Sequence, residues 1–176
     1  EYVTDNQLSR LTGYYTDAEN LIVSGKNIGE AKIKGLSLTS DWQINSFLFG
    51  LGYDYLDAED RNLVKPAFSN STYGKDLVYR PKNSGLIYVG YQQPSFGVRL
   101  EAKHTDDRFS DADNTVKLDA YTLLNLSGSM YITPNLRANL RVDNITDEDY
   151  TLSNQFGIEY ATDGTSYFGS LTYNWF

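Results

Sequence analysis

The feature that most constrains the fold is a strict alternation of bulky and small side chains in residues 46–60, SFLFGLGYDYLDAED. The odd positions from Phe47 to Tyr55 are all large and apolar or aromatic, whereas the even positions between them are Leu48, two glycines and Asp54. Successive side chains of a β-strand point to opposite faces, so this period predicts a strand with one bulky apolar face and one nearly bare face. The apolar face could line the inside of a soluble sandwich or the outside of a barrel in a membrane.

Seven other segments have strand character, and with residues 46–60 they predict about eight strands. These segments lie at residues 7–18, 31–42, 77–92, 96–106, 121–132, 136–144 and 166–176. Short turns at 43–46, 92–95 and 133–135 alternate with long polar connections near 19–30, 57–76, 106–118 and 145–165. Short turns at one end of a sheet and long loops at the other are typical of outer-membrane barrels. No helical period competes, so we expect residues 1–176 to form one continuous antiparallel sheet.

The side chains of these segments sort by parity into two unlike faces. One face is apolar and aromatic, from Leu36 through Phe47 to Leu171, and none of its residues is charged. The other face carries the charged residues Asp41, Asp54, Arg99, Glu101, Lys103, Arg137, Arg141 and Asp143. Buried charges need partners or water, so this second face cannot pack into a dry core. A basic side chain facing the middle of a bilayer costs about 2–4 kcal/mol, which would keep charge off a face that lipid covers.

Composition narrows the class of fold and function further. No apolar run approaches the roughly 18 residues that a spanning helix needs, but a membrane barrel exposes only every second strand residue to lipid. The net charge of −8 argues against a nucleic-acid partner, and the absence of cysteine excludes disulfides and thiolate metal sites. Aromatic residues such as Trp42, Tyr91 and Trp175 concentrate near strand ends, as in the aromatic girdles of membrane proteins. The sequence therefore favours an all-β, antiparallel, up-and-down transmembrane β-barrel over a soluble sandwich.

Four stretches in order resemble one family, the TonB-dependent outer-membrane receptors. LRVDNITDEDYTL resembles the end of a strand that closes in Asn-Leu-Phe-Asp and then Tyr, with Asn144, Asp147 and Tyr150 at the matched positions. Ile145 and Thr146 depart from the usual pair. LVYRPKNSG (77–85), GEAKIKGLSL (29–38) and YDYLDAED (53–60) are similar to three further stretches of the family. The last strand also resembles the family's aromatic C-terminal strand.

The resemblance implies a fold and a function. Such receptors are barrels of about 22 strands closed by an N-terminal plug, so residues 1–176 would supply the C-terminal part of the barrel. The plug, the TonB-binding segment and the signal peptide would then lie outside this chain, which would be a fragment or one part of a split transporter. The implied partners are outer-membrane lipid, the rest of the barrel, the plug and TonB.

The resemblance also implies a ligand and a location in the bacterial outer membrane. NIGEAKIKG (27–35) and the short turns resemble the vitamin B12 (cobalamin) branch, so cobalamin is the expected cargo. Ferric siderophores are the alternative ligand. A different alternative is a small, self-contained eight-stranded structural barrel, whose interior side chains can fill.

Candidate site residues fall into three groups. The expected ligand contacts are loop aromatics: Phe68, Tyr73, Phe109, Phe156 and Tyr160. Arg99, Glu101, Lys103, Arg137 and Arg141 are expected to form a charge network on the lumen wall, with Glu101 facing the arginines of residues 136–144. Two acidic runs could hold calcium, because hard cations prefer clustered carboxylates. Those carboxylates are Asp57, Glu59 and Asp60 in one run and Asp111 and Asp113 in the other.

No enzymatic activity is expected. His104 is the only histidine, and without cysteine the chain offers no supported pair of nucleophile and base.

Overall fold

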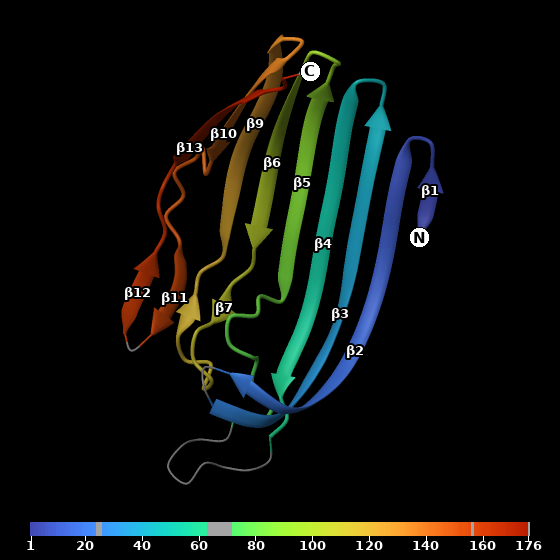
Figure 1. The fold of residues 1–176 in the computed structure, drawn as a ribbon. Coiled ribbons are helices and arrows are strands. Elements are labelled where there is room, and N and C mark those ends of the chain that lie inside the picture. Colours follow the sequence, from blue (N-terminus) through green and yellow to red (C-terminus); the bar gives the residue numbers. More distant parts are fainter. Residues whose placement is uncertain (24–25, 63–71, 156, 176) are drawn as a thin grey trace.

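The structure is a computed structural model that describes residues 1–23, 26–62, 72–155 and 157–175. These residues form one antiparallel sheet and two small hairpins (Figure 1). The sheet runs in the order β1 (Tyr2–Thr4), β2 (Gln7–Val23), β3 (Lys26–Ile44), β4 (Phe47–Asp60), β5 (Asn83–Gln92), β6 (Phe96–Thr105), β9 (Tyr121–Thr133), β10 (Leu136–Asp143) and β13 (Ser166–Tyr173). The hairpins are β7 (Arg108–Phe109) with β8 (Lys117–Leu118), and β11 (Thr151–Gln155) with β12 (Ile158–Ala161). No helix among these residues is long and apolar enough to cross a bilayer.

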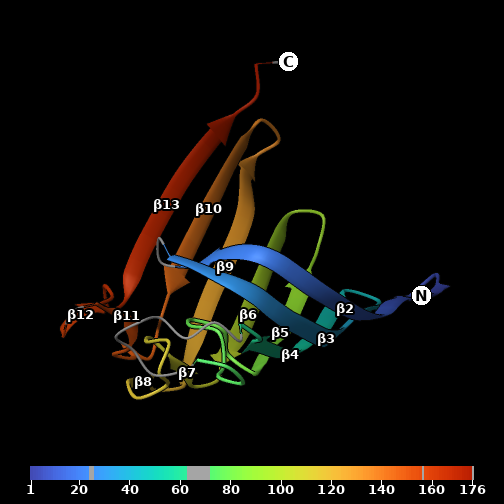
Figure 2. The same cartoon turned by 90° about the horizontal axis from the view of Figure 1, so that it is seen from below.

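The predicted up-and-down, all-β fold is confirmed. Each strand of the sheet pairs antiparallel with the next strand that joins the sheet, and β1 is a short addition to the eight expected strands. Short turns gather at one end, whereas the hairpins β7–β8 and β11–β12 lie at the other end (Figures 1 and 2). Pro94 and Asn45, the latter with a φ of 54°, lie in the short turns. The sheet is open, because no described pairing joins β13 to β1 or β2, so the closed eight-stranded barrel raised as an alternative is not observed.

Three predicted boundaries are wrong. The segment near 19–30 is not a long connection, because β2 and β3 stay paired up to Val23 and Lys26. Likewise β4 continues to Asp60. Backbone hydrogen bonds hold a strand whatever its side chains, so a hydrophilic stretch can extend a sheet. The predicted strand start at Leu77 is also wrong: β5 begins at Asn83, after Tyr79 with a φ of 58° and after Pro81.

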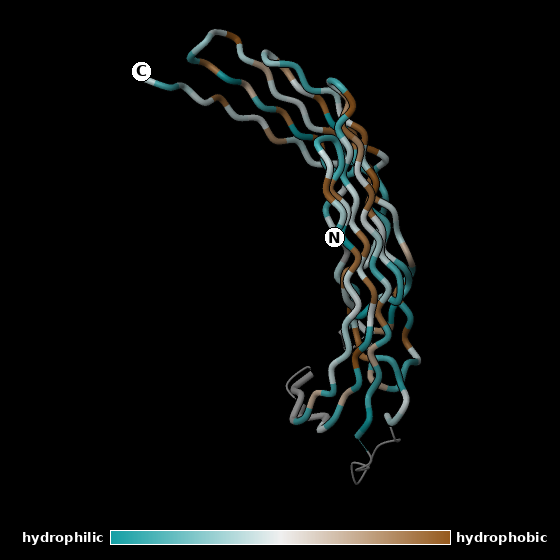
Figure 3. The backbone as a smooth tube through the Cα atoms, turned by 90° about the vertical axis from the view of Figure 1, so that its right-hand side faces the viewer, coloured by the Kyte–Doolittle hydropathy of each residue, from teal (hydrophilic) through white to brown (hydrophobic). Residues whose placement is uncertain are grey.

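The strand register confirms that the apolar positions share one face. Leu38 lies opposite Tyr53, Phe49 opposite Val89, and Leu140 opposite Gly169, each within a ladder that keeps parity along its length. In Figure 3 the sheet is seen edge-on as a single bent layer, with no second layer over either face. Ile87 is 57% exposed and Leu171 69% exposed. An apolar face without a covering layer contradicts a soluble sandwich and fits a face that lipid covers.

Aromatic rings form a band on this apolar face beside the short turns. Tyr91 lies between Phe47 and Phe96, with ring centroids 5.0 Å and 5.8 Å away. Phe49 continues the band at 6.4 Å from Phe47. Such a band marks the level where a barrel meets the interface of a membrane.

The only apolar cluster that is buried among the described residues lies at the opposite end of the sheet. Ala31 and Ala58 pack there against Leu77, which belongs to the connection between β4 and β5. Ile33 and Leu56 flank this cluster. Parity puts these strand residues on the face that carries Asp41 and Asp54, so this connection folds back over the charged face rather than over the apolar one.

Candidate functional site

The five predicted lumen charges share one face of the sheet. Arg99, Glu101 and Lys103 alternate along β6, and Arg137 and Arg141 lie on β10. Ser127 of β9 is the register partner of Arg99 on one side and of Arg141 on the other. We refer to this surface, which carries all five charges, as the polar face. Their role in lining a lumen stays a prediction.

The ion pairs of Arg99 and Arg141 run along their strands rather than across them. Arg99 Nη2 lies 2.7 Å from Glu101 Oε2, and Arg141 Nε lies 3.0 Å from Asp143 Oδ2. The expected pairing of Glu101 with the arginines of β10 is therefore not observed. Residues two apart in a strand point to the same face, so each arginine finds a carboxylate on its own strand, while β9 presents serine between them.

A layered stack on the polar face was missed by the sequence analysis. The ring of Tyr88 lies over Gly50, where an added Cβ would collide with it. Tyr88 Oη donates a 2.6 Å hydrogen bond to Asp41 Oδ1, and the Arg99 guanidinium lies 3.5 Å from the ring centroid. Gly50 thus makes room for a tyrosine that supports an arginine. Gly35 lies under Tyr14 in the same way. Glycine in a strand was a signal for close approach, but its partner could not be read from the sequence.

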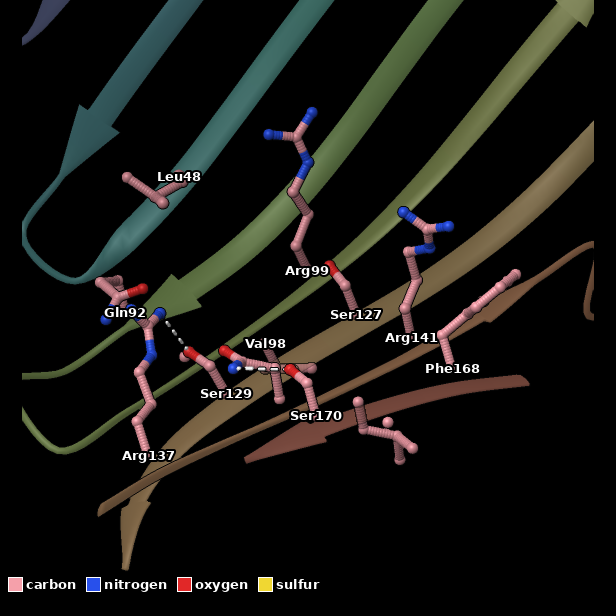
Figure 4. Close-up of a pocket in the computed structure, with 15 residues that line it drawn as sticks. Leu48, Gln92, Val98, Arg99, Ser127, Ser129, Arg137, Arg141, Phe168 and Ser170 are labelled. Carbon is pink, nitrogen blue, oxygen red and sulfur yellow. Dashed lines mark hydrogen bonds between the residues drawn. The ribbon is translucent and has the colours of Figure 1, made fainter. Parts of the chain in front are cut away.

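The polar face is hollowed between the ends of β4 and β5 and the strand β13, as Figure 4 shows. We call this the arginine hollow; its volume is about 650 Å³. Its lining includes Gln92, Arg99, Arg137, Asn139, Arg141 and Phe168. Arg137 Nη2 donates to Ser129 Oγ at 3.0 Å, and Asn139 Nδ2 donates to Ser170 Oγ at 3.2 Å. The hollow is therefore lined by three arginines beside small polar and apolar residues.

The predicted ligand-contact aromatics that the structure describes are not brought into one cluster. Phe68 and Phe156 lie outside the described residues. Tyr73 is exposed, and its hydroxyl accepts a 3.3 Å hydrogen bond from Arg61 Nη1. Phe109 is half-buried in β7, and Tyr160 is exposed in β12. No ring contact joins these last three in the part of the chain that the structure describes, so their shared role stays a prediction.

The predicted calcium carboxylates of the first acidic run already have protein partners. Asp57 pairs with Lys34 at 2.9 Å, Glu59 pairs with Arg61, and Asp60 Oδ2 accepts a 2.6 Å hydrogen bond from the Thr72 hydroxyl. Within the described ranges, no group of three or more acidic or histidine side chains is placed to hold a metal ion. Calcium at either acidic run stays a prediction.

Asp111, of the second acidic run, shapes its own loop. Its carboxylate accepts hydrogen bonds from the backbone N–H of Val116 at 2.7 Å and of Thr115 at 3.0 Å. Burial raises the pKa of Asp111, but these hydrogen bonds and the one from the Thr115 hydroxyl outweigh it and hold the pKa below its usual value. The charged form of Asp111 is therefore part of the folded loop.

A second feature missed by the sequence analysis is a brace between the long connections. Arg108 is only 7% exposed, and its Nη2 donates to the carbonyl oxygens of Thr151 at 3.0 Å and Leu152 at 3.2 Å. Its guanidinium lies 5.4 Å from the ring of Tyr121, which stacks on Tyr150 at 4.1 Å. The brace joins the connection 106–120 to the connection 144–165.

Two other residues join the third connection to the same assembly. The backbone N–H of Tyr79 donates to Phe109 O at 2.7 Å, and the Tyr79 hydroxyl donates to Asn154 O at 3.3 Å. Asn114 exchanges two hydrogen bonds with the backbone of Asp76, at 2.8 Å and 3.0 Å. The connections 72–82, 106–120 and 144–165 are therefore linked to one another, and we refer to them together as the braced connections.

Two of the positions matched by the resemblance, Asn144 and Asp147, form a clasp between β10 and β13. Asn144 is buried with a φ of 53°, and its side chain both accepts from and donates to the backbone of Glu148. Asp147 Oδ1 accepts a 3.0 Å hydrogen bond from the Thr165 N–H, and the Thr165 hydroxyl donates to Asn144 O at 2.8 Å. This clasp fixes where the connection leaves β10 and enters β13.

Comparisons with known proteins agree on one family. The family model described as "TonB dependent receptor-like, beta-barrel" matches residues 2–145. The chain is 31% identical to the vitamin B12 transporter BtuB of Photobacterium profundum over 93% of its length and 27% of that protein. It is 28% identical to the vitamin B12 transporter BtuB of Vibrio cholerae over 83% of its length and 24% of that protein. The chain thus spans about a quarter of the length of the curated relatives that it matches.

Solved structures show the same fold. The ferric yersiniabactin uptake receptor FyuA of Yersinia pestis superposes with a TM-score of 0.83 at 17% identity, over 99% of this chain and 28% of that one. The siderophore receptor PiuA of Acinetobacter baumannii superposes with a TM-score of 0.77 at 21% identity, over 98% of this chain and 26% of that one. At these identities the likeness concerns the fold alone.

Proposed function

Since the chain belongs to the TonB-dependent receptor β-barrel family of the bacterial outer membrane, we propose that it forms the C-terminal part of the barrel of a transporter that imports cobalamin. The choice of cobalamin as the ligand rests on the likeness to the vitamin B12 transporter of Photobacterium profundum. The solved structures named for siderophore receptors share the fold at lower identity, so a ferric siderophore is the competing ligand in the test. The proposed activity is transport, not catalysis.

The two faces of the sheet support the proposed placement in a barrel wall. The apolar face, with its aromatic band, would contact outer-membrane lipid. The polar face, with Arg99, Arg137 and Arg141, would line the lumen together with the remaining strands and a plug. A barrel of that size leaves a lumen that has to be closed, and TonB would act through a segment outside this chain.

The braced connections would form part of the outer entrance. Tyr73, Phe109 and Tyr160 are the proposed ligand contacts among the described residues. Exposed aromatic rings can bury large apolar area against a bulky ligand at low cost in conformational entropy. Arg108 and Tyr79 would keep the entrance in shape without contacting the ligand.

The test is uptake of radiolabelled cobalamin by cells that carry the complete protein and by cells from which its gene has been deleted. We expect uptake to fall on deletion, to return with the gene, and to stop when the proton gradient is collapsed. Labelled ferric siderophores are offered in parallel. Uptake of a ferric siderophore alone would contradict cobalamin while keeping the transporter, and a lack of any uptake phenotype would contradict both.

A further inference from the structure

The arginine hollow has the features of an anion site. We propose that Arg99, Arg137 and Arg141 bind an anionic group with several oxygen atoms, a carboxylate or a phosphate. The proposal rests on the proposed function only in that the polar face lines a lumen; it does not depend on the identity of the transported ligand. The anion can belong to a soluble molecule or to an acidic side chain of another segment in the lumen, and the experiment below separates these two sources.

The three arginines lie on one concave surface. Arg99 on β6 and Arg141 on β10 lie on either side of Ser127, and Arg137 lies four residues from Arg141 along β10, on the same face. All three line the same hollow (Figure 4). Guanidinium groups match planar carboxylate and phosphate oxygens through paired N–H donors, so three of them on one concave surface form a multidentate anion site.

Aromatic rings hold the three guanidinium groups in place. Each guanidinium lies near an aromatic ring: Arg99 is 3.5 Å from the centroid of Tyr88, and Arg141 is 4.6 Å from that of Phe168. Arg137 is 5.7 Å from the centroid of Tyr131. A ring beneath the plane of a guanidinium fixes its orientation while the N–H groups at its edge can still donate. Binding an anion there would therefore order little that is not already ordered.

The positive charges of the three arginines are not all neutralised by neighbouring carboxylates. Glu101 neutralises Arg99 and Asp143 neutralises Arg141, but Arg137 forms no ion pair with any described residue. The hollow thus carries an excess positive charge on a chain whose net charge is −8. Its other polar lining residues are uncharged: Gln92, Ser127, Ser129, Asn139 and Ser170. A concave site with an excess of one charge attracts the opposite charge more strongly than a flat surface does.

The experiment compares two arginine variants of the complete protein purified in detergent. Arg137→Gln removes the excess charge from the hollow. Arg10→Gln is the matched control, because Arg10 shares the polar face, lies on β2 away from the hollow, and pairs with Glu1 at 3.4 Å. Citrate, a tricarboxylate, is the probe, and its binding is measured by titration calorimetry at low ionic strength. Thermal unfolding of all three proteins is measured at low and at high salt.

Two results would support the anion site and would identify where the anion comes from. If the wild type binds citrate, Arg137→Gln should weaken binding by about tenfold or more and Arg10→Gln should not, which indicates a soluble anion. If the wild type does not bind citrate, Arg137→Gln should lower the unfolding midpoint at low salt but not at high salt, which indicates an internal carboxylate.

All other results overturn the proposal. One such result is citrate binding by the wild type that Arg137→Gln leaves unchanged. The other is no citrate binding by the wild type, together with an unfolding midpoint of Arg137→Gln that equals that of Arg10→Gln or falls equally at both salt concentrations. Cobalamin uptake is measured on the same variants as a separate readout. Loss of the anion site with normal uptake, or the reverse, therefore shows which of the two proposals has failed.

Discussion

The sheet and the braced connections are held together by contacts of different kinds. Within the sheet, each residue is positioned by a ladder that repeats along two neighbouring strands, so any single side chain is one of many constraints. In the braced connections, order depends on a few single hydrogen bonds between segments far apart in sequence, such as Arg108 to Thr151, 43 residues away. We therefore expect one substitution to disturb a connection more than it disturbs the sheet.

The largest effect is expected from Arg108→Ala. This change removes the two charge-assisted hydrogen bonds to Thr151 and Leu152 and leaves those carbonyl oxygens without their donor. We expect local opening of residues 144–165 to become easier by about 2–3 kcal/mol. Hydrogen exchange followed by mass spectrometry measures this segment and the sheet in one experiment. Arg80→Ala, at an exposed arginine in the neighbouring connection, serves as the control, and equal effects of the two variants would refute the brace.

Gly50→Ala tests the comparison inside the sheet. The added methyl group collides with the ring of Tyr88, whereas a Cβ at Gly52, two residues along the same face, would lie 3.7 Å from its nearest neighbour. We expect Gly50→Ala to cost about 1–3 kcal/mol of unfolding free energy and Gly52→Ala clearly less. Unfolding in urea measures both. In a Tyr88→Ala background Gly50→Ala should cost clearly less than in the wild type, and an equal cost in both backgrounds would show that the ring is not the cause.

Asn144→Ala tests the clasp where the sheet meets a connection. Alanine loses both hydrogen bonds to Glu148 and tolerates the positive φ poorly, so we expect a loss of about 1–2 kcal/mol in the protection of residues 144–165. Asn144→Gly retains the backbone conformation and separates the two causes. If glycine and asparagine give the same hydrogen exchange, the side-chain hydrogen bonds contribute nothing.

The smallest effect is the pH dependence of the loop that Asp111 organises. Because the folded pKa of Asp111 is lowered, its ionised form stabilises the loop above the unfolded pKa of about 3.9, and this is lost as the pH falls through the folded pKa. We expect hydrogen exchange of residues 110–117, corrected for its intrinsic rate, to increase below about pH 4. Asp111→Asn should remove this pH dependence, whereas Asp113→Asn should keep it. An unchanged profile in Asp111→Asn would contradict the role of its charge.

The fold could be predicted from the sequence wherever residues close together in the sequence determine it. Alternation from Phe47 to Tyr55 identified a strand and its apolar face, and the same parity rule placed Arg99 and Arg141 on the opposite face. The rule failed at residues 19–30, because polar side chains suggested a loop while the backbone continued the ladder. Hydrophilic composition thus indicates exposure to water rather than the end of a strand.

The candidate site was predictable only in part, for a related reason. Parity states which charges share a face, but it does not state which of them pair, and Glu101 binds the arginine on its own strand rather than those on β10. The partners of Arg108, Tyr79 and Asn114 lie tens of residues away. No local pattern encodes those distances, so Arg108 in the sequence resembles any other charged residue of a polar loop.

The central claim is that one face of the sheet meets lipid while the other meets an aqueous lumen, and spin-label accessibility tests it most directly. Residues 1–176 contain no cysteine, so once every cysteine outside them has been replaced by serine, single cysteines at Leu126 and Ser127 of β9 label uniquely in the complete protein in membranes. We predict that the label at residue 126 collides mainly with oxygen, which concentrates in lipid, and that the label at residue 127 collides mainly with a water-soluble nickel complex. Equal accessibility of the two positions to both reagents would contradict the account.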